Sequence, residues 1–300
     1  MTQINSSAYL FGRPSGEFVV PYHGTDLAFG AVRLDGERIE HGNFSHSTFA
    51  NIGFKEVVLI SSAFLNCVFI GCYFRRAELT DSRFVGCKFV DCNFNHVAIK
   101  SCDFKYSSFR GCQLPFSECL YSLPAEPNLR EELARNLALA SSQLGLSSEA
   151  RQYRMEEIRA REAHLRAAIL ADSQWYKEHF DGFARLRAGV QWSLSLANRW
   201  LWGYGERGRV LAGNVLMLGL VICPAAFWLL RDGLVHATRS NIGFWDAVYF
   251  SLENIVPSGL DSRVTAIGFA TRMVAGLESV FGVVVLALFA SYVFRWSLHR

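Results

Sequence analysis

The sequence predicts a multidomain membrane protein in which a β-solenoid is followed by an α-helical linker and an all-α membrane domain. Three observations predict this order: an apolar residue at every fifth position through residues 39–119, apolar residues at helical spacing through residues 125–205, and two long apolar stretches within residues 207–300. The composition agrees, since a chain of 300 residues with 51% hydrophobic residues and a mean hydropathy of +0.16 is more apolar than an ordinary soluble protein.

The first segment, residues 1–38, contains glycines, prolines and short apolar runs, and we interpret it as a cap for the open end of the solenoid. Its beginning has no basic region followed by an apolar run, so no secretion signal is predicted and the N-terminus is expected in the cytoplasm. The whole chain carries 30 basic and 27 acidic residues, a net charge of only +3, which gives no reason to expect a nucleic-acid partner.

The solenoid prediction depends on one column of large apolar residues. A period of five fits neither a helix nor a flat strand, so the chain must coil, with equivalent positions stacked at the strand spacing of roughly 4.8 Å. Two residues before each large residue stands one that is nearly always small. The large residues are Phe44, Phe49, Phe54, Leu59, Phe64, Phe69, Phe74, Leu79, Phe84, Phe89, Phe94, Ile99, Phe104, Phe109 and Leu114.

This pattern resembles the pentapeptide-repeat family, and the resemblance implies a right-handed quadrilateral β-helix with four repeats per coil. Some members of that family mimic DNA through a strongly acidic surface. Residues 39–119 carry eight Lys or Arg and seven Asp or Glu, so this rod is a poor phosphate mimic. We interpret it as a rigid spacer or as a docking surface for a cytoplasmic protein partner.

The cysteines raise the alternative of a metal or disulfide site. Seven of the eight lie in or just after the repeat, and six of those occupy its column of small residues. No CxxC pair occurs, so we predict no metal site and no cofactor, and we expect these thiols to act as small buried side chains in a reducing compartment. They are Cys67, Cys72, Cys87, Cys92, Cys102, Cys112 and Cys119.

Residues 125–205 predict a helical hairpin linker and an interfacial helix. Leucines at helical spacing precede Gly145, and a second apolar stripe follows Ser147, while mixed charges at i,i+4 spacing cover the other face. These charges are typical of a solvated helix and carry no catalytic pattern. Residues 190–202 are rich in Trp and Leu, which favours a helix lying on the inner leaflet.

The membrane domain, residues 207–300, predicts two transmembrane helices at 210–230 and 273–294. The second contains Glu278, a carboxylate that must face protein or water. Between them, residues 242–256 form an apolar helix too short to cross the bilayer. The loop at 257–261 follows it, and this combination is typical of a re-entrant segment that lines an aqueous path.

Two motifs in this domain resemble potassium-channel-like proteins with two spans. The run Phe244-Trp245-Asp246-Ala247-Val248-Tyr249-Phe250-Ser251 is similar to their pore helix, and residues 272–282 are similar to the start of their inner helix, with Gly282 as its hinge. The resemblance implies an ion channel in which four copies surround one axial pore. It also implies permeant inorganic ions and the lipid bilayer as partners.

The filter sequence departs from that family. A potassium filter reads Thr-Val-Gly-Tyr-Gly-Asp, whereas this chain lacks the tyrosine and one glycine and has a proline that fixes φ. We therefore predict a pore that is not strictly potassium selective. Whether it passes cations or anions is open, and Glu253 is as well suited to bracing the loop as to meeting ions. The predicted filter and pore-loop residues are Glu253, Asn254, Val256, Pro257, Ser258, Gly259, Leu260 and Asp261.

Beyond Gly282 we predict that one face of the second span lines the pore, with Phe294 as an apolar gate that closes by dewetting. The alternative is that these residues pack against other helices. Arginines flanking the spans on the side of the termini favour an inner-membrane, multi-pass protein with both termini cytoplasmic. The predicted pore-lining and gate residues are Val283, Leu286, Ala290 and Phe294.

Two other functions compete with a channel. The first is a membrane-anchored scaffold without conduction, but an anchor has no need of a short helix between its spans. The second is an enzyme, which we do not predict, because the chain has no GxSxG, P-loop, HExxH or dinucleotide fingerprint and its eight histidines are scattered. The gating stimulus cannot be named from the sequence.

Overall fold

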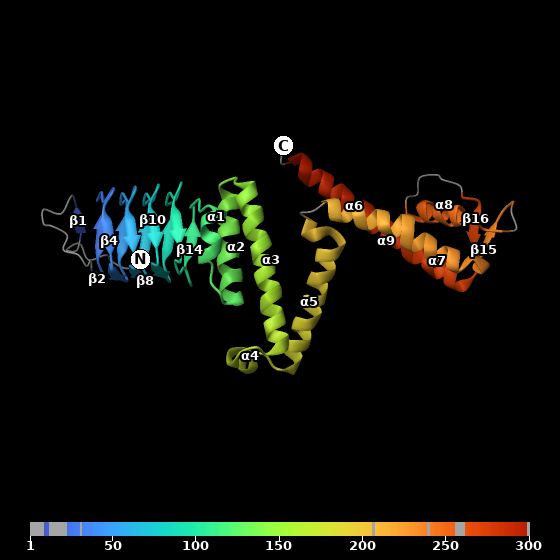
Figure 1. The fold of residues 1–300 in the computed structure, drawn as a ribbon, viewed down its shortest axis with the longest axis horizontal. Helices are drawn as coiled ribbons and strands as arrows, with labels where there is room; N and C mark the ends of the chain where they lie inside the picture. Colours follow the sequence, from blue (N-terminus) through green and yellow to red (C-terminus); the bar gives the residue numbers. More distant parts are fainter. Residues whose placement is uncertain are drawn as a thin grey trace. The chain divides into compact units, whose positions relative to one another are not determined.

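The computed structural model of the chain describes residues 9–11, 23–30, 32–205, 208–238, 241–255 and 262–298. Two compact units, Met1–Gly189 and Val190–Arg300, divide the chain, and each is described by itself. Figure 1 shows strands and helices of the first unit and mainly helices in the second.

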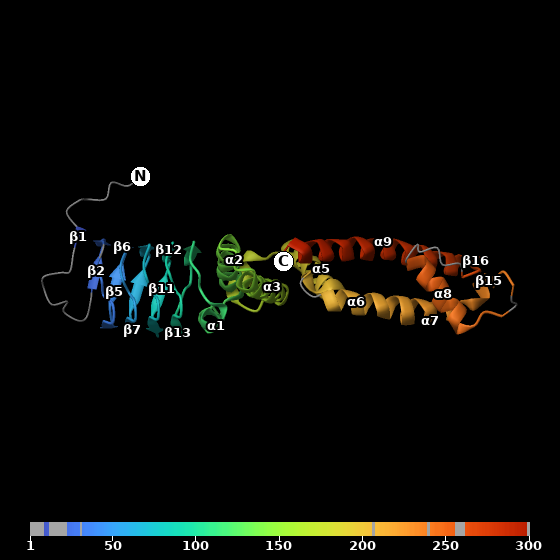
Figure 2. The ribbon, with the colours of Figure 1, turned by 90° about the horizontal axis from the view of Figure 1, so that it is seen from above.

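The first unit contains a β-solenoid built from strands of three residues. From His23 on, each strand pairs in parallel with the strand twenty residues further along, so four five-residue repeats complete one coil. Phe49, for example, is opposite Phe69, which is opposite Phe89. Both views show the strands stacked along the solenoid (Figures 1 and 2).

Three of the four faces are continuous parallel sheets, and the fourth is a column of isolated bridges from Arg33 to Gln113. The first sheet contains β1 (Tyr9–Phe11), β3 (Ala28–Gly30), β6 (Thr48–Ala50), β9 (Val68–Ile70), β12 (Lys88–Val90) and β14 (Ser108–Arg110). The second contains β4 (Arg38–Glu40), β7 (Val58–Ile60), β10 (Glu78–Thr80) and β13 (Ala98–Lys100). The third contains β2 (His23–Thr25), β5 (Asn43–Ser45), β8 (Ala63–Leu65) and β11 (Arg83–Val85).

The column of large apolar residues forms the core of the solenoid, as the spacing predicts. The Phe49, Phe69 and Phe89 rings stack with centroids 4.8 Å apart, the distance between neighbouring strands. The residues two positions earlier are also buried, and the Cys72 thiol donates to the Phe49 carbonyl at 3.3 Å. The β-solenoid is thereby confirmed, while its right-handedness stays a prediction.

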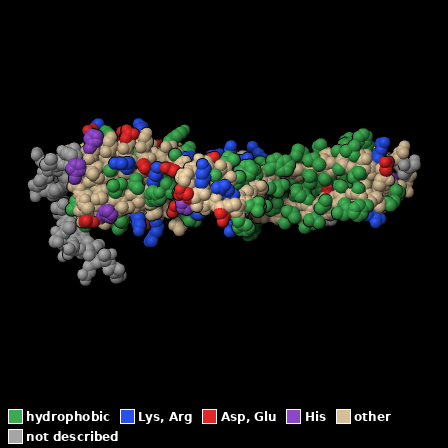
Figure 3. Space-filling model, turned by 90° about the horizontal axis from the view of Figure 1, so that it is seen from below, with side chains coloured by type: hydrophobic (Ala, Val, Ile, Leu, Met, Phe, Trp, Pro, Cys, Tyr) green, Lys and Arg blue, Asp and Glu red, His purple; other side chains and the backbone are tan. Residues whose placement is uncertain are grey.

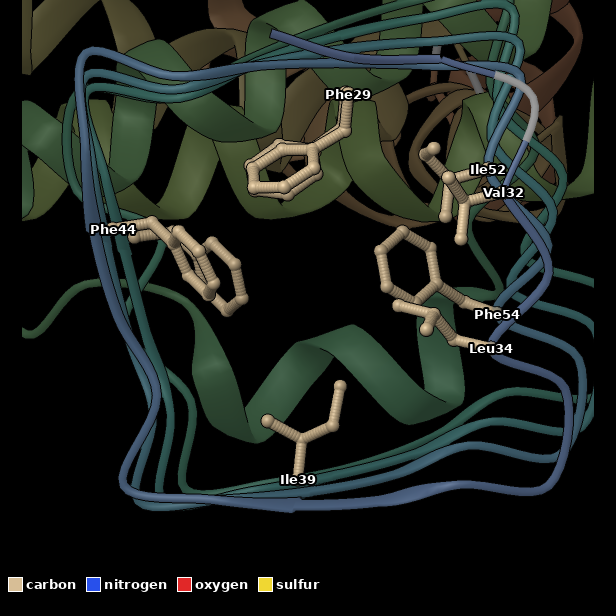
Figure 4. Close-up of a pocket in the computed structure, with 9 residues that line it drawn as sticks. Phe29, Val32, Leu34, Ile39, Phe44, Ile52 and Phe54 are labelled. Atoms are coloured by element: carbon tan, nitrogen blue, oxygen red, sulfur yellow. The ribbon is translucent and has the colours of Figure 1, made fainter. Parts of the chain in front are cut away.

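The ladder of strands begins before the predicted repeat. Within the segment interpreted as a cap, β2 and β3 continue the third and first faces, and Phe29 stacks on Phe49 at 5.1 Å. In these coils the column of large residues reads Gly24, Phe29, Leu34 and Ile39, so the run of phenylalanines is absent here. Figure 4 shows side chains of this end around a small apolar cavity, among them Phe29, Ile39, Phe44 and Phe54.

A helical hairpin covers the other end of the solenoid. It consists of α2 (Pro127–Gln143) and α3 (Ser147–Leu170), and is reached through α1 (Phe116–Cys119) and the short η2 (Leu120–Ser122). Leu133, Leu137 and Tyr153 belong to the same buried cluster as the phenylalanine stacks. The hairpin predicted as a linker therefore also caps the last coil, which would otherwise expose its apolar interior.

Hydrogen bonds fix this cap to the last coil. Asn136 Oδ1 accepts the N–H of Phe109 at 2.7 Å, and Tyr153 donates its hydroxyl to the Leu114 carbonyl at 3.0 Å. These side chains satisfy backbone groups that have no further strand to pair with. Burial raises the pKa of the Tyr153 hydroxyl, which keeps it protonated as a donor.

After Ala171, which ends α3 in the left-handed region at φ 52°, the chain forms α4 (Gln174–His179) and α5 (Gly182–Trp202). Tyr176 packs its ring against His164 of α3, and the hydroxyl lies 2.8 Å from the His164 Nδ1. Burial lowers the pKa of His164, so the neutral ring is favoured in this contact.

The second unit holds two helical segments that are long and apolar enough to cross a membrane, Arg209–Leu229 and Phe269–Ser291. The first consists of α6 (Gly208–Met217), the π-helical turn η4 (Leu218–Ile222) and α7 (Cys223–Leu229), and the second lies within α9 (Phe269–Leu298). In their most apolar windows only 28% and 17% of residues are buried. A core helix of a soluble protein would be mostly buried, so these faces favour a membrane protein.

The remaining elements of this unit are the short η3 (Gly203–Gly205) and η5 (Arg231–Gly233), the strands β15 (Leu234–His236) and β16 (Val264–Ala266), and α8 (Phe244–Ile255). Figure 3 shows hydrophobic side chains over most of the visible face of this unit, whereas charged side chains are spread over the first unit. The predicted short helix at 242–256 corresponds to α8.

Candidate functional site

The short helix α8 packs against both long apolar helices. Figures 1 and 2 both place it beside α7 and α9. The Phe250 ring of α8 meets Phe227 of α7 edge to face, with ring centroids 4.9 Å apart. Ala247 is fully buried in the same apolar cluster, which also contains Val264. Asp246 accepts the N–H of Gly243 at 2.9 Å and so caps the start of the helix.

The two ends of the segment that contains α8 lie side by side. The strands β15 and β16 pair in antiparallel fashion, with Leu234 opposite Ala266, and Ala237 donates to the Arg263 carbonyl at 2.8 Å. The chain between them therefore leaves and returns at the same end of the two long helices. A segment with this connection does not cross from one end of the helices to the other.

The C-terminal end of α8 reaches the middle of both long helices. A Cβ added at Gly219 would lie 2.7 Å from Ile255 Cδ1, and one added at Gly282 would overlap the Ile255 backbone. Gly219 lies ten residues before Leu229, or roughly 15 Å along the helix, which is half of a hydrocarbon core roughly 30 Å thick. Because Gly219 and Gly282 have no side chains, Ile255 at the end of α8 can approach both long helices near their middle.

The first apolar helix is widened where it meets α8. In the π-helical turn η4, the Cys223 N–H bonds the Leu218 carbonyl, five residues back, instead of the Gly219 carbonyl. The next residue, Pro224, has no N–H to donate. The carbonyl of Gly219 consequently faces α8 without a backbone donor from either position.

A polar cluster fills this widened place. Ser251 Oγ of α8 lies 3.0 Å from the Gly219 carbonyl oxygen and 2.5 Å from Glu278 Oε1 of α9. Ser251 is 0% exposed and Glu278 3% exposed. Three segments far apart in the chain therefore meet at one hydroxyl group. We call the three residues Gly219, Ser251 and Glu278 the Ser251 cluster.

Two of the predicted pore-loop residues lie in described parts of α8. Glu253 Oε2 accepts the N–H of Ser262 at 3.1 Å, so this carboxylate joins α8 to the residue that follows the predicted filter in the chain. Asn254 has a buried Nδ2 that makes no hydrogen bond within the described residues. The predicted filter positions Val256, Pro257, Ser258, Gly259, Leu260 and Asp261 lie outside the described residues.

The predicted pore-lining residues all lie on α9 and are all exposed in the single chain: Val283, Leu286, Ala290 and Phe294. They point away from the buried face that Glu278, Gly282 and Val285 turn toward the rest of the unit. Their position fits both a pore wall and a contact with lipid or another copy, so pore lining stays a prediction.

Sequence reasoning identified Glu278 as a charge that must face protein or water but missed its two partners. A serine in a short helix and a glycine in an apolar span are common residues. The sequence signal that indicates an irregular turn in the first apolar helix is Pro224, because a proline inside a helix removes a backbone hydrogen bond.

Comparisons with known proteins support the solenoid alone. A family model described as pentapeptide repeats matches residues 77–115, and one described as the SV2A/B/C luminal domain matches residues 25–94. A search of the curated proteins finds no match. Together with the strand register, the match to the pentapeptide-repeat model shows a pentapeptide-repeat β-solenoid.

Among solved structures, Rfr23, a pentapeptide repeat protein from the cyanobacterium Cyanothece, is 8% identical with a TM-score of 0.21, covering 30% of this chain and 86% of Rfr23. A pentapeptide repeat protein from the Arabidopsis thaliana thylakoid lumen is 16% identical, with a TM-score of 0.17 and coverage of 35% and 76%. QnrB1, a plasmid-mediated fluoroquinolone resistance protein, is 25% identical, with a TM-score of 0.14 and coverage of 29% and 48%.

Proposed function

We propose that this chain is the subunit of an ion channel in which α8 and the loop after it form a re-entrant pore loop. The observation that carries the proposal is the path of this segment. It begins and ends at the paired strands β15 and β16, yet the end of α8 meets Gly219 and Gly282 midway along the two apolar helices. The proposal places the loop at 257–261 at this depth, where backbone that is not helical requires an aqueous or protein environment, which a pore supplies.

Several copies are needed to enclose such a pore. One loop cannot surround an axis, and the apolar faces of α6, α7 and α9 are uncovered in the single chain. Lipid covers part of this surface in the proposal, and contacts among four identical subunits cover the rest. The face of α9 with Val283, Leu286, Ala290 and Phe294 then lines the inner part of the pore.

The proposed pore is not strictly potassium selective, because the loop at 257–261 lacks the second glycine and the tyrosine of a potassium filter. The C-terminal end of α8 carries the negative end of its helix dipole toward the middle of the membrane, which favours cations there. Glu253, whose carboxylate holds Ser262, acts in this proposal as a brace for the loop and not as an ion ligand.

The channel proposal also assigns a role to the first unit and a location to the protein. The solenoid with its helical cap serves as a cytoplasmic sensor or docking domain for a protein partner, and the protein resides in the inner membrane with both termini in the cytoplasm. The proposal includes no catalytic activity and no cofactor.

Purified protein reconstituted in liposomes tests the proposal through ion flux and through reversal potentials in asymmetric KCl and NaCl. We expect currents with a cation preference that discriminate weakly between potassium and sodium. Gly259→Ala should change the selectivity, and Phe294→Ala should raise the open fraction. Ile70→Ala, on the outer surface of the solenoid, is the matched control that should leave the currents unchanged.

Silent bilayers together with monomeric protein would overturn the channel. The same result would support a membrane-anchored scaffold, in which the two apolar helices only hold the solenoid at the membrane surface.

A further inference from the structure

The Gly219 carbonyl needs a donor from outside its own helix. It is buried in the π-helical turn, where the Cys223 N–H bonds Leu218 and Pro224 has none to offer. A buried carbonyl without a donor is unfavourable. The Ser251 hydroxyl lies 3.0 Å from this oxygen, which accepts only, so the hydroxyl proton belongs to this bond.

The hydroxyl has no second proton for Glu278. The Ser251 Oγ and Glu278 Oε1 atoms are nevertheless 2.5 Å apart, a distance that two oxygens reach only with a proton between them. One hydroxyl proton cannot serve both Gly219 and Glu278, whereas a proton on the carboxyl group satisfies both contacts. A neutral Glu278 that donates to Ser251 is the arrangement in which both oxygens beside the serine hydroxyl take part in a hydrogen bond.

The surroundings also favour the neutral acid. Glu278 forms no ion pair among the described residues, and its second oxygen, Oε2, has no hydrogen-bond partner there. The groups beside the carboxyl, apart from Ser251, are the Cys223 thiol of α7 and the Asn254 amide of α8, which can donate hydrogen bonds but carry no positive charge. Burial of a carboxylate without a cation nearby is unfavourable, which supports the neutral form.

The charged residues on the elements around Glu278 are engaged elsewhere or lie toward the helix ends. Asp246 and Glu253 of α8 accept the N–H groups of Gly243 and Ser262. Arg272 of α9 donates to the Ala266 carbonyl, Arg231 lies over the Trp228 ring, and Arg209 is exposed at the start of α6. Asp232 follows Arg231 in η5, beyond the end of α7.

We infer that Glu278 is a proton-binding site whose bound proton joins α9 to α8 and, through Ser251, α8 to the π-helical turn. Loss of the proton leaves one serine proton for the Gly219 carbonyl and Glu278 Oε1, so one of these two oxygens loses its hydrogen bond to Ser251. The bond network then holds α8 less firmly, next to Ile255 and the predicted filter. Its consequence for conduction rests on the proposed channel function, whereas the proton site itself does not.

Infrared spectroscopy of the full chain in lipid nanodiscs tests the protonation directly. We expect a carbonyl stretching band of a protonated carboxylic acid near neutral pH that disappears in Glu278→Gln and shifts in Ser251→Ala. The band should remain in Glu132→Gln, which replaces an exposed carboxylate of α2. A wild-type spectrum without the band would mean that Glu278 is ionised and accepts from Ser251, which overturns the inference.

Thermal unfolding of the second unit gives an independent readout. The unfolded chain releases a glutamate proton near about pH 4.3, whereas the folded unit keeps it, so stability should fall as the pH rises above that value. We expect Tm to drop by about 3 °C or more from about pH 5 to about pH 8. Glu278→Gln keeps a donor and should remove this drop, and a drop that persists in this variant would contradict the inference.

Flux measurements separate the proton site from the channel. If both are correct, raising the pH should change the wild-type open fraction but not that of Glu278→Gln. Flux whose pH dependence is equal in the two proteins overturns the regulatory consequence and leaves the channel intact. Silent liposomes that still show the infrared band and the Tm difference overturn the channel and leave the proton site intact.

Discussion

The two units of this chain bury their apolar residues in opposite ways. In the solenoid, phenylalanines point to one axis and stack at 4.8 Å, and a helical hairpin closes the last coil, so one chain completes its own core. In the second unit, most of the apolar surface of the two long helices points outward. The difference teaches that the first unit buries its apolar residues within one chain, while the two long helices of the second leave most of theirs uncovered in the single chain.

Among the changes that test this comparison, a cavity in the solenoid core should have the largest effect on stability. Phe69 is fully buried between the rings of Phe49 and Phe89, so Phe69→Ala should destabilise the first unit by about 3–5 kcal/mol. Ile70→Ala, on the next residue but 42% exposed, should cost less than about 0.5 kcal/mol. Hydrogen exchange of the strand amides measures both. Equal effects would mean that the phenylalanine stack is not the stabilising core.

A charge on an exposed apolar position tests what covers the second unit. Leu277 of α9 is 67% exposed, and Leu277→Arg should destabilise the protein in a bilayer by about 2.5–3.5 kcal/mol, because an arginine there would be transferred from water into hydrocarbon. The control is Ile70→Arg on the solenoid, where water already surrounds the side chain. Thermal unfolding in nanodiscs compares them, and a harmless Leu277→Arg would show that water covers this face.

The close approach of α8 to α9 predicts a smaller, local effect. The Cβ of Gly282→Ala would overlap the Ile255 backbone, and the displacement of α8 should cost about 1–3 kcal/mol. Gly276 lies in the same helix with nothing within 4 Å of its added Cβ, so Gly276→Ala should be neutral or stabilising. Tryptophan fluorescence during thermal unfolding distinguishes the two. If both variants behave alike, α8 does not occupy the middle of the helices.

The smallest expected effect is on the contact between α3 and α4. Burial lowers the pKa of His164, so its contribution to stability is complete above the usual histidine value of 6.5 and is lost as the pH falls through the lowered folded value. Acidification should therefore loosen Tyr176 and Trp175, visible as a change in tryptophan emission. His164→Gln should remove this pH dependence, and an unchanged titration in that variant would assign it to another group.

The sequence by itself determined the coil of the solenoid and the two apolar helices. A period of five places Phe49, Phe69 and Phe89 on one inward column, and the length and apolarity of the two stretches are local properties that need no knowledge of contacts. The match between the predicted short helix at 242–256 and α8 has the same origin. The beginning of the solenoid was harder to predict, because its first coils use few phenylalanines.

Only the tertiary structure decided which residues meet. The hairpin that reads as a linker caps the solenoid, because Asn136 and Tyr153 reach backbone groups of the last coil. In the Ser251 cluster, Ser251 lies 32 positions after Gly219 and 27 positions before Glu278. No periodic pattern in the sequence pairs this serine with the Gly219 carbonyl, which lacks a backbone donor because of Pro224. Such contacts depend on how helices pack in space, which spacing along one chain does not encode.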